Sequence, residues 1–292
     1  MNILLAPNNY YVMPTVVLLQ SLFETAQEPL DIYMIHSDLT QENIRKLDDF
    51  ITVRGGAFHE LQIDDSIFDQ AHTSIHITKQ AYYRLLAQRV LPETVEKILY
   101  LDGDLVVNRS LKGLYDMSFM GDDGNEKYFI VCEGPGVSRR EWSVYDNLGI
   151  PHEYAYFNSG VLLMNIRLLR DTFDPQILLD FIRDKGSNLK YHDQDTLNAL
   201  FYDKVIYADW HIYNQTVLHI QDKVEAAKRL ENAAIIHYAG SDKPWKHDYK
   251  SYYFSLFWQF ARRAGYRKQY VQLMCRRFCW KMNNRLGKGG KR

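Results

Sequence analysis

The sequence has little of several features that mark specialised classes of protein. It contains only three cysteines, Cys132, Cys275 and Cys279, which is too few for a disulfide framework and fits a reducing cytosol. No window approaches roughly 18 uninterrupted apolar residues, so no transmembrane helix is expected. The N-terminus MNILLAPNNYY lacks a basic start followed by a long apolar run, which predicts no signal peptide. We therefore expect a cytoplasmic protein.

Acidic residues are absent between Lys250 and Arg292, a stretch that holds twelve Lys or Arg. The other 249 residues carry 23 basic and all 36 acidic side chains, so the net charge of −1 conceals an acidic body and a basic tail. Residues 251–263 predict an aromatic helix whose first half packs on the core. Apolar residues at roughly helical spacing within 267–292, among them Phe278 and Trp280, predict an amphipathic helix.

This basic helix suits attachment to an anionic membrane surface, which would place the protein peripherally on the inner face of the cytoplasmic membrane. A solvated basic tail is the alternative. No nucleic-acid partner is expected, because no recognised nucleic-acid-binding module accompanies the basic residues.

Hydrophobic residues make up 46% of the chain and charged residues 24%, which predicts a packed globular core. Short apolar runs alternate with helical patterns. The expected strands span residues 2–6, 30–36, 96–101, 128–132, 160–166 and 233–238, and the expected helices span 14–26, 40–51, 78–91 and 193–201. This alternation predicts an α/β fold with a mixed, mostly parallel sheet, in which ligands bind beyond the carboxyl ends of the strands.

The segment KILYLDGDLVVN places Asp102 and Asp104 directly after a buried strand. Both side chains point to one side if the strand continues that far, and Gly103 lets the backbone bend between them. Two carboxylates about 4 Å apart repel by roughly 4 kcal/mol at an effective dielectric near 20, so a cation is expected between them. A divalent metal is the economical choice, and two aspartates capping a turn are the alternative.

The segment YLDGDLVV resembles the DxD motif of retaining family-8 glycosyltransferases, such as bacterial lipopolysaccharide galactosyl- and glucosyltransferases and, more distantly, glycogenin. Five further segments match family motifs in the expected order, and the resemblance covers residues 1–248. It implies a single Rossmann-like nucleotide-sugar-binding domain of the GT-A type there, with residues 249–292 as a separate basic helical region.

The resemblance also implies a reaction. A metal-dependent, retaining enzyme would move glucose or galactose from a UDP-sugar to a saccharide or lipid-linked saccharide acceptor, as in cell-surface glycan or lipopolysaccharide synthesis.

The segment LLAPNNYYVMP resembles the part of the family that binds uracil and ribose. Ala6 matches the family pattern, and Tyr11 matches the aromatic residue that stacks on uracil. Asn8 and Asn9 replace the usual acidic pair, and their amides can still bond a ribose hydroxyl or a uracil edge. The alternative is a strand-to-helix loop in which asparagine serves turn geometry.

Two further segments resemble sugar-contacting motifs. HITKQAYYRLL implies that Arg84 contacts the diphosphate or the sugar, with His76 as a weaker candidate. YFNSGVLLMNI implies that Asn158 and Ser159 bond sugar hydroxyls, while Gly160 permits a tight entry into the strand that follows.

The last two segments carry the implied catalytic and metal-binding residues. YHDQDTLNALF resembles the helix start that brings Asp193 and Gln194 to the transferred sugar. Because glutamine is a poor nucleophile, a front-face route is favoured over a covalent one. IIHYAGSDKPW implies that His237 joins Asp102 and Asp104 as the third metal ligand.

One imidazole nitrogen among oxygens favours Mn²⁺ over Mg²⁺ as the cofactor. The implied UDP-sugar-binding residues are Ala6, Asn8, Asn9, Tyr11, Arg84, Asp102, Gly103, Asp104, Asn158, Ser159, Gly240 and Lys243.

Two other functions compete. Asp102, Asp104 and Val106 satisfy the D-x-D-x-(T/V) pattern of haloacid dehalogenase-type phosphatases, with Asp102 as nucleophile, although that function leaves HYAGSDKPW without a role. A non-catalytic nucleotide-sugar-binding protein is the second alternative, and Asn8 and Asn9 are its support.

Overall fold

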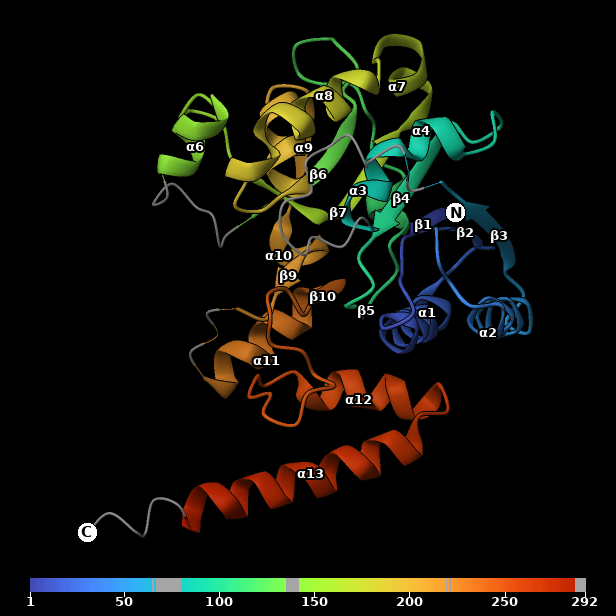
Figure 1. The fold of residues 1–292 in the computed structure, drawn as a ribbon, viewed down its shortest axis with the longest axis vertical. Helices are drawn as coiled ribbons and strands as arrows, with labels where there is room; N and C mark the ends of the chain where they lie inside the picture. Colours follow the sequence, from blue (N-terminus) through green and yellow to red (C-terminus); the bar gives the residue numbers. More distant parts are fainter. Residues whose placement is uncertain (65, 67–79, 135–141, 219, 221, 287–292) are drawn as a thin grey trace.

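The core of the protein is a seven-stranded mixed sheet in the order β3-β2-β1-β4-β7-β6-β8 (Figure 1). A computed structural model describes residues 1–64, 66, 80–134, 142–218, 220 and 222–286. The strands are β1 Asn2–Leu5, β2 Asp31–His36, β3 Ala57–Gln62, β4 Lys97–Leu101, β6 Phe129–Glu133, β7 Phe157–Asn165 and β8 Val205–Ala208. Strand β7 runs antiparallel to β4 and β6, and the other pairings are parallel. The predicted mixed, mostly parallel sheet is confirmed.

Both faces of the sheet are covered, because successive side chains of a strand point to opposite faces. Ile3 and Leu5 of β1 belong to one hydrophobic cluster, and Leu4 belongs to the other. The first cluster includes residues of α1 Val12–Thr25, α2 Gln41–Thr52 and α12 Phe254–Arg263. The second includes residues of α4 Ala87–Val90, α7 Ile166–Thr172, α8 Gln176–Lys185 and α9 Asp193–Phe201.

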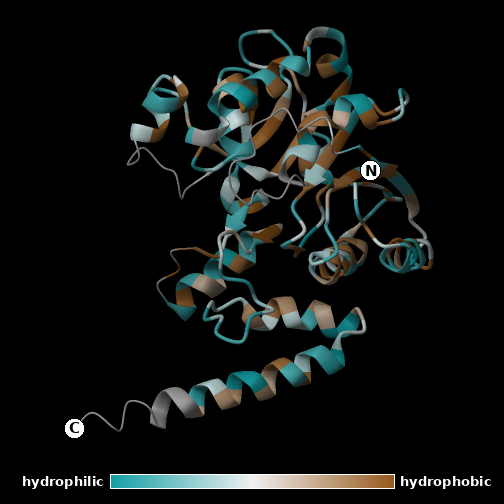
Figure 2. Cartoon of the chain, viewed as in Figure 1, coloured by the Kyte–Doolittle hydropathy of each residue, from teal (hydrophilic) through white to brown (hydrophobic). Residues whose placement is uncertain are grey.

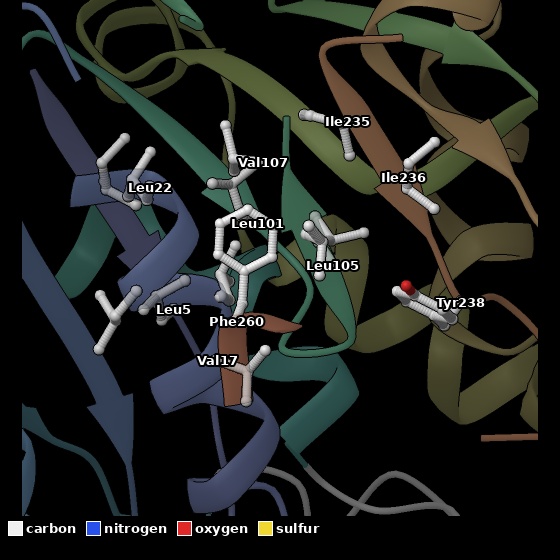
Figure 3. Close-up of a cluster of buried hydrophobic side chains, with 14 of the residues drawn as sticks. Leu5, Val17, Leu22, Leu101, Leu105, Val107, Ile235, Ile236, Tyr238 and Phe260 are labelled. Carbon is white, nitrogen blue, oxygen red and sulfur yellow. The ribbon is translucent and has the colours of Figure 1, made fainter. Parts of the chain in front are cut away.

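A second, three-stranded sheet joins two segments that lie far apart in the sequence. It contains β5 Leu105–Val107, β10 Ile235–His237 and β9 Gln215–Thr216. In the antiparallel pair β5–β10, His237 lies opposite Leu105, and Tyr238 N donates to Asp104 O at 3.1 Å. Buried side chains from these strands meet α1 and α12 in the cluster of Figure 3, which includes Leu105, Ile236 and Phe260. This pairing brings the DxD segment and the HYAGSDKPW segment together.

The strands and long helices expected from the sequence are present, with three differences. Strands β3, β5, β8 and β9 are additional. AFHELQ of β3 lacks a continuous apolar run, and the other three strands have only two to four residues. The expected helix 78–91 consists of the short segments α3 Gln80–Tyr83, η2 Arg84–Leu86 and α4, and residues 78 and 79 lie outside the described residues. The strand expected at 160–166 already begins at Phe157, so Gly160 lies inside β7 rather than at its entry.

Short elements complete the fold. They are α5 Lys112–Tyr115, α6 Trp142–Leu148, η4 Gly186–Asn188, α10 Trp210–Tyr213 and α11 Lys223–Asn232.

The C-terminal region has two helices of different character (Figures 1 and 2). Helix α12 buries Phe257 and Phe260 in the same cluster as α1, which confirms the predicted core packing of this segment. Helix α13 Arg267–Leu286 buries Leu273, while Val271 and Phe278 are exposed. None of the described helices combines the length and the apolar character needed to cross a bilayer.

Candidate active site

A cleft of about 560 Å³ lies where the two sheets meet. The residues that line it are Ala6, Asn8, Tyr11, Arg84, Tyr100, Asp102, Gly103, Asp104, Asn158, Ser159, Lys190, Tyr191, His192, Asp193, Gln194, His237, Ala239, Gly240 and Lys243. The structure thus brings together residues from all six predicted segments. Two candidates are not among them: Asn9 points elsewhere, and His76 lies outside the described residues.

Three potential metal ligands converge at one end of this cleft. Asp102 follows the last residue of β4, Asp104 precedes the first residue of β5, and His237 ends β10. One ligand atom from each residue lies within 4.8 Å of the others. The two aspartates are therefore placed by two different sheets, because the chain leaves the large sheet at Asp102 and enters the small one after Asp104.

Each carboxylate has one oxygen held by a protein cation and one oxygen directed toward the imidazole. Asp102 Oδ1 accepts from Tyr100 Oη at 2.6 Å and lies 3.0 Å from Arg84 Nη1, while Asp102 Oδ2 lies 3.9 Å from His237 Nε2. Asp104 Oδ2 binds Lys243 Nζ, and Asp104 Oδ1 lies 3.6 Å from His237 Nε2. Two oxygens and a nitrogen around one point fit a divalent cation of the Mn²⁺ or Mg²⁺ type.

The surroundings keep Asp104 ionised although it is buried. Burial by itself would raise the pKa of Asp104, but the Lys243 ammonium and the contact with His237 outweigh it, and the pKa falls well below its usual value. Lys243 Nζ also donates to Tyr238 O at 2.9 Å, which holds the ammonium in place. The site therefore presents charged carboxylate oxygens at neutral pH.

Arg84 is the central cation of the cleft and is almost completely buried. Its guanidinium donates to Ser159 O at 2.6 Å, contacts Asp102, and lies 3.4 Å from Asp193 Oδ2. The guanidinium carbon also lies 4.1 Å from the centre of the Tyr100 ring. These contacts indicate that Arg84 orients two carboxylates. Arg84 also lines the cleft, and its contact with the diphosphate or the sugar stays a prediction.

Strand β7 and helix α9 form a wall of the cleft next to the metal-ligand cluster. Ser159 Oγ donates to Asp193 Oδ2 at 3.1 Å, and burial raises the pKa of Asp193 against the opposing effect of Arg84. Gln194 Oε1 accepts from Asn158 Nδ2 at 2.8 Å and from Ser159 N at 3.1 Å. Gln194 Nε2 donates to Tyr156 Oη at 3.2 Å, so the amide is fixed at both ends.

The loop between β1 and α1 closes the cleft on a third side. Tyr11 lines the cleft, and its ring meets the Trp245 ring edge-on with centroids 5.7 Å apart. Asn8 Oδ1 accepts from Tyr11 N at 3.0 Å, so Asn8 serves turn geometry while also lining the cleft. The side chain of Asn9 bonds Asp38 O and Thr40 N, which ties this loop to the start of α2. Asn9 does not line the cleft, and its contact with the nucleotide stays a prediction.

His192 has a strained backbone at the edge of the cleft. Its φ of 52° and ψ of −109° are those of a turn position that favours glycine, and Gln194 N closes the turn onto Tyr191 O at 3.0 Å. The buried Nδ1 of His192 has no hydrogen-bond partner among the residues that the structure describes. Such strain persists only where the surrounding structure enforces it, and it is typical of functional sites.

Several lining or supporting residues were not predicted from the sequence. Tyr100 could have been predicted to line the cleft. It precedes Asp102 by two residues at the end of a strand, so both side chains point to the same face of the sheet. Nothing in YHDQD or WHIYNQ marks His192 or Asn214, since their roles depend on contacts that only the folded chain makes.

Residues 2–249 match the model of the family "Glycosyl transferase family 8", which covers this cleft completely. The chain therefore belongs to glycosyl transferase family 8. It is 25% identical over 244 residues to general stress protein A of Bacillus subtilis, covering 78% of this chain and 82% of that protein. It is 30% identical over 186 residues to the lipopolysaccharide glucosyltransferase WaaO of Escherichia coli, covering 59% of this chain but only half, 50%, of that protein.

The fold agrees with this assignment. The crystal structure of the galactosyltransferase LgtC in complex with donor and acceptor sugar analogues superposes with a TM-score of 0.77 at 23% identity, covering 92% of this chain and 100% of that one. The architecture is thus the GT-A-like fold predicted from the sequence, and the protein is a family-8 glycosyltransferase.

Proposed function

We propose that this protein is a metal-dependent, retaining hexosyltransferase that uses a UDP-sugar donor and a saccharide acceptor. The observation that carries the proposal is the convergence of Asp102, Asp104 and His237 in the cleft that also contains Asp193 and Gln194. A divalent cation bound there would stabilise the negative charge that develops on the leaving diphosphate.

The chain's own residues supply the rest of the diphosphate site. Lys243 lies at the metal-ligand cluster and provides a positive charge beside the phosphate position. Gly240, with φ of 88°, shapes the loop between His237 and Lys243 so that its backbone borders the cleft. Tyr11, braced by Trp245, offers an aromatic surface for the base.

The sugar site is built from groups that can orient hydroxyls but do not attack carbon. Asp193 and Ser159 form one hydrogen-bonded pair along the cleft wall. The Gln194 oxygen already accepts two hydrogen bonds, which lowers its nucleophilicity further. This arrangement supports a front-face route with retained anomeric configuration, in which the acceptor hydroxyl is held and water is kept out.

The identity of the transferred sugar is part of the proposal. WaaO is named as a glucosyltransferase and LgtC as a galactosyltransferase, and both names support a hexose. WaaO is also named for lipopolysaccharide, which supports a saccharide acceptor of a cell-surface glycan. Glucose and galactose differ at one hydroxyl, so both donors belong in the first assay.

The test is transfer by the purified full chain from UDP-glucose and UDP-galactose, with and without Mn²⁺ or Mg²⁺. We expect metal-dependent UDP release, an α-linked product from an α-linked donor, and a loss of about 10²–10³-fold in Asp104→Asn. Asp122→Asn, which changes an exposed carboxylate outside the cleft, is the matched control and keeps the wild-type rate. Unchanged transfer in a folded Asp104→Asn variant would contradict the metal assignment.

Other outcomes distinguish the rival functions. Binding of UDP-sugar in the presence of Mn²⁺ without turnover on any acceptor would indicate a non-catalytic binding protein. Release of inorganic phosphate in place of UDP would indicate a phosphatase, an alternative that the family match leaves without support.

We also propose that α13 attaches the enzyme to an anionic membrane surface. Val271, Met274, Phe278 and Met282 follow one another at three- and four-residue spacing, so they share one face of the helix, and they are 40–67% exposed. The opposite face packs on the protein through Leu273 and through Arg277, which donates to Tyr249 O at 2.8 Å. Twelve Lys or Arg and no acidic residue between 250 and 292 complement anionic lipid.

A further inference from the structure

Four side chains form a continuous hydrogen-bonded chain between the sugar side of the cleft and the metal-ligand cluster. The chain runs from Gln194 to Asn158, from Asn158 to Asn214, and from Asn214 to His237, with distances of 2.8, 2.7 and 2.8 Å. Asn214 is completely buried between α10 and β9 and is the member that sequence patterns did not reveal.

Backbone N–H groups fix the orientation of the first two amides. Ser159 N donates to Gln194 Oε1 at 3.1 Å, and Gly160 N donates to Asn158 Oδ1 at 3.0 Å. A backbone N–H is always a donor, so each of these side-chain atoms must be the amide oxygen. Rotating either amide by half a turn would place its NH₂ group against a backbone N–H, so two donors would face each other.

This orientation passes through Asn214 to the imidazole. Asn158 Oδ1 is an acceptor, so the Asn214 atom 2.7 Å away must be Nδ2. Asn214 therefore turns its oxygen toward His237 Nδ1, at 2.8 Å, and that nitrogen must carry the proton. A neutral imidazole protonated on Nδ1 keeps its lone pair on Nε2, the nitrogen that faces Asp102 and Asp104.

We infer that Asn214 is a positioning residue that holds His237 in the Nδ1-protonated tautomer and so keeps Nε2 ready to bind the metal. The inference deepens the proposed metal-dependent function and rests on it for the metal, but the tautomer itself is a property of the metal-free chain. The same side chain also donates to Asn158, which in turn donates to Gln194. Asn214 therefore links the side-chain orientations of Asn158 and Gln194 to the orientation of the metal ligand His237.

Two substitutions of Asn214 distinguish its hydrogen bond to His237 from its hydrogen bond to Asn158. Asn214→Leu is similar in size but removes the acceptor for His237 Nδ1, so the imidazole is no longer held in one tautomer. Asn214→Asp keeps an acceptor for His237 but loses the donor to Asn158, so it preserves the metal end and disturbs the sugar end. Asn165→Leu is the matched control, because Asn165 is a buried, hydrogen-bonded asparagine at the other end of β7.

The first measurement is the tautomer in the metal-free, full-length protein. Imidazole ¹⁵N shifts are recorded at mildly alkaline pH, and the His237 signals are assigned by their loss in His237→Gln. We expect the Nδ1-protonated form in wild type, Asn165→Leu and Asn214→Asp, and its loss in Asn214→Leu. An Nε2-protonated His237 in wild type would overturn the inference, and this result requires no variant other than the His237→Gln protein used for the assignment.

The second measurement is Mn²⁺ affinity by calorimetry, with thermal unfolding as a check on each variant. Asn214→Leu should bind Mn²⁺ about ten- to a hundredfold more weakly, and Asn214→Asp should stay near wild type but transfer sugar more slowly. A folded Asn214→Leu variant with wild-type Mn²⁺ affinity would also overturn the inference. An Nδ1-protonated His237 in a wild-type protein that binds no Mn²⁺ would instead refute the proposed metal-dependent function and leave the tautomer assignment intact.

Discussion

Gly160 and His237 lie so close together that no other residue fits at position 160 without a shift. A β-carbon added to Gly160 would lie 2.5 Å from His237 Cε1 and 2.8 Å from Asp102 Oδ2. Real contacts of a β-carbon are longer, so the strand β7 backbone must approach the metal-ligand cluster without a side chain. The glycine in YFNSGV thus serves close packing in mid-strand, and it allows two ligands from other strands to meet.

The first prediction follows from this contact. Gly160→Ala should displace His237 and Asp102 and lower Mn²⁺ affinity about ten- to a hundredfold, measured by calorimetry. Gly56→Ala is a suitable control, because its β-carbon would lie 2.7 Å from Phe23 Cζ, outside the cleft. That variant should lose stability and keep its metal affinity. Equal Mn²⁺ binding by Gly160→Ala and wild type would show that the ligands do not share an ion.

The second prediction concerns the pairing of Lys243 with Asp104 in the metal-free protein. The folded-state pKa of Asp104 is lowered, so the pair stabilises the fold above the ordinary carboxyl pKa, and this stability is lost as pH falls through the folded-state pKa. Lys243→Met should reduce the free energy of unfolding by about 2 kcal/mol at neutral pH, with a smaller deficit in strong acid. Chemical denaturation at several pH values measures this. A deficit that grows as pH falls would contradict the assignment.

The third prediction tests the strain at His192. Glycine adopts the φ of 52° without cost, whereas alanine keeps the strain and also loses the side chain. His192→Gly should therefore be more stable than His192→Ala by about 1 kcal/mol. At a position with negative φ the alanine variant would be the more stable of the two. Denaturant titration of the two variants decides, and an alanine variant of equal or greater stability would show that the backbone there is relaxed.

The fourth prediction concerns the exposed face of α13. Replacing Val271 and Phe278 by Ser should weaken sedimentation with vesicles that contain anionic lipid, because two apolar side chains would no longer enter the interface. The same variant should keep its transfer rate on a soluble acceptor. Replacing Val53, an exposed apolar residue on another helix end, is the control. Binding unaffected by the double substitution, or equal binding to neutral vesicles, would refute attachment through this face.

The sequence by itself determined the fold class and the composition of the cleft. Apolar runs predicted the central strands, and Asp102, which directly follows one of those runs, was expected at the carboxyl end of the sheet. The family motifs then implied the chemistry, and four of the six segments contribute their expected residues to the cleft in full. In LLAPNNYYVMP, Asn9 bonds the backbone of a neighbouring loop, and in HITKQAYYRLL the candidate His76 lies outside the described residues.

The tertiary structure alone decided how these residues are held. Strand β10 pairs with β5 in one register, and that register sets His237 beside Asp104. The buried contacts of Arg84 and the amide of Asn214 join residues that are distant in the sequence. The positive φ of His192 is a backbone conformation that no sequence pattern marked. Hydrogen-bond direction is a property of such packed neighbours, so no pattern in the chain could specify which nitrogen of His237 carries its proton.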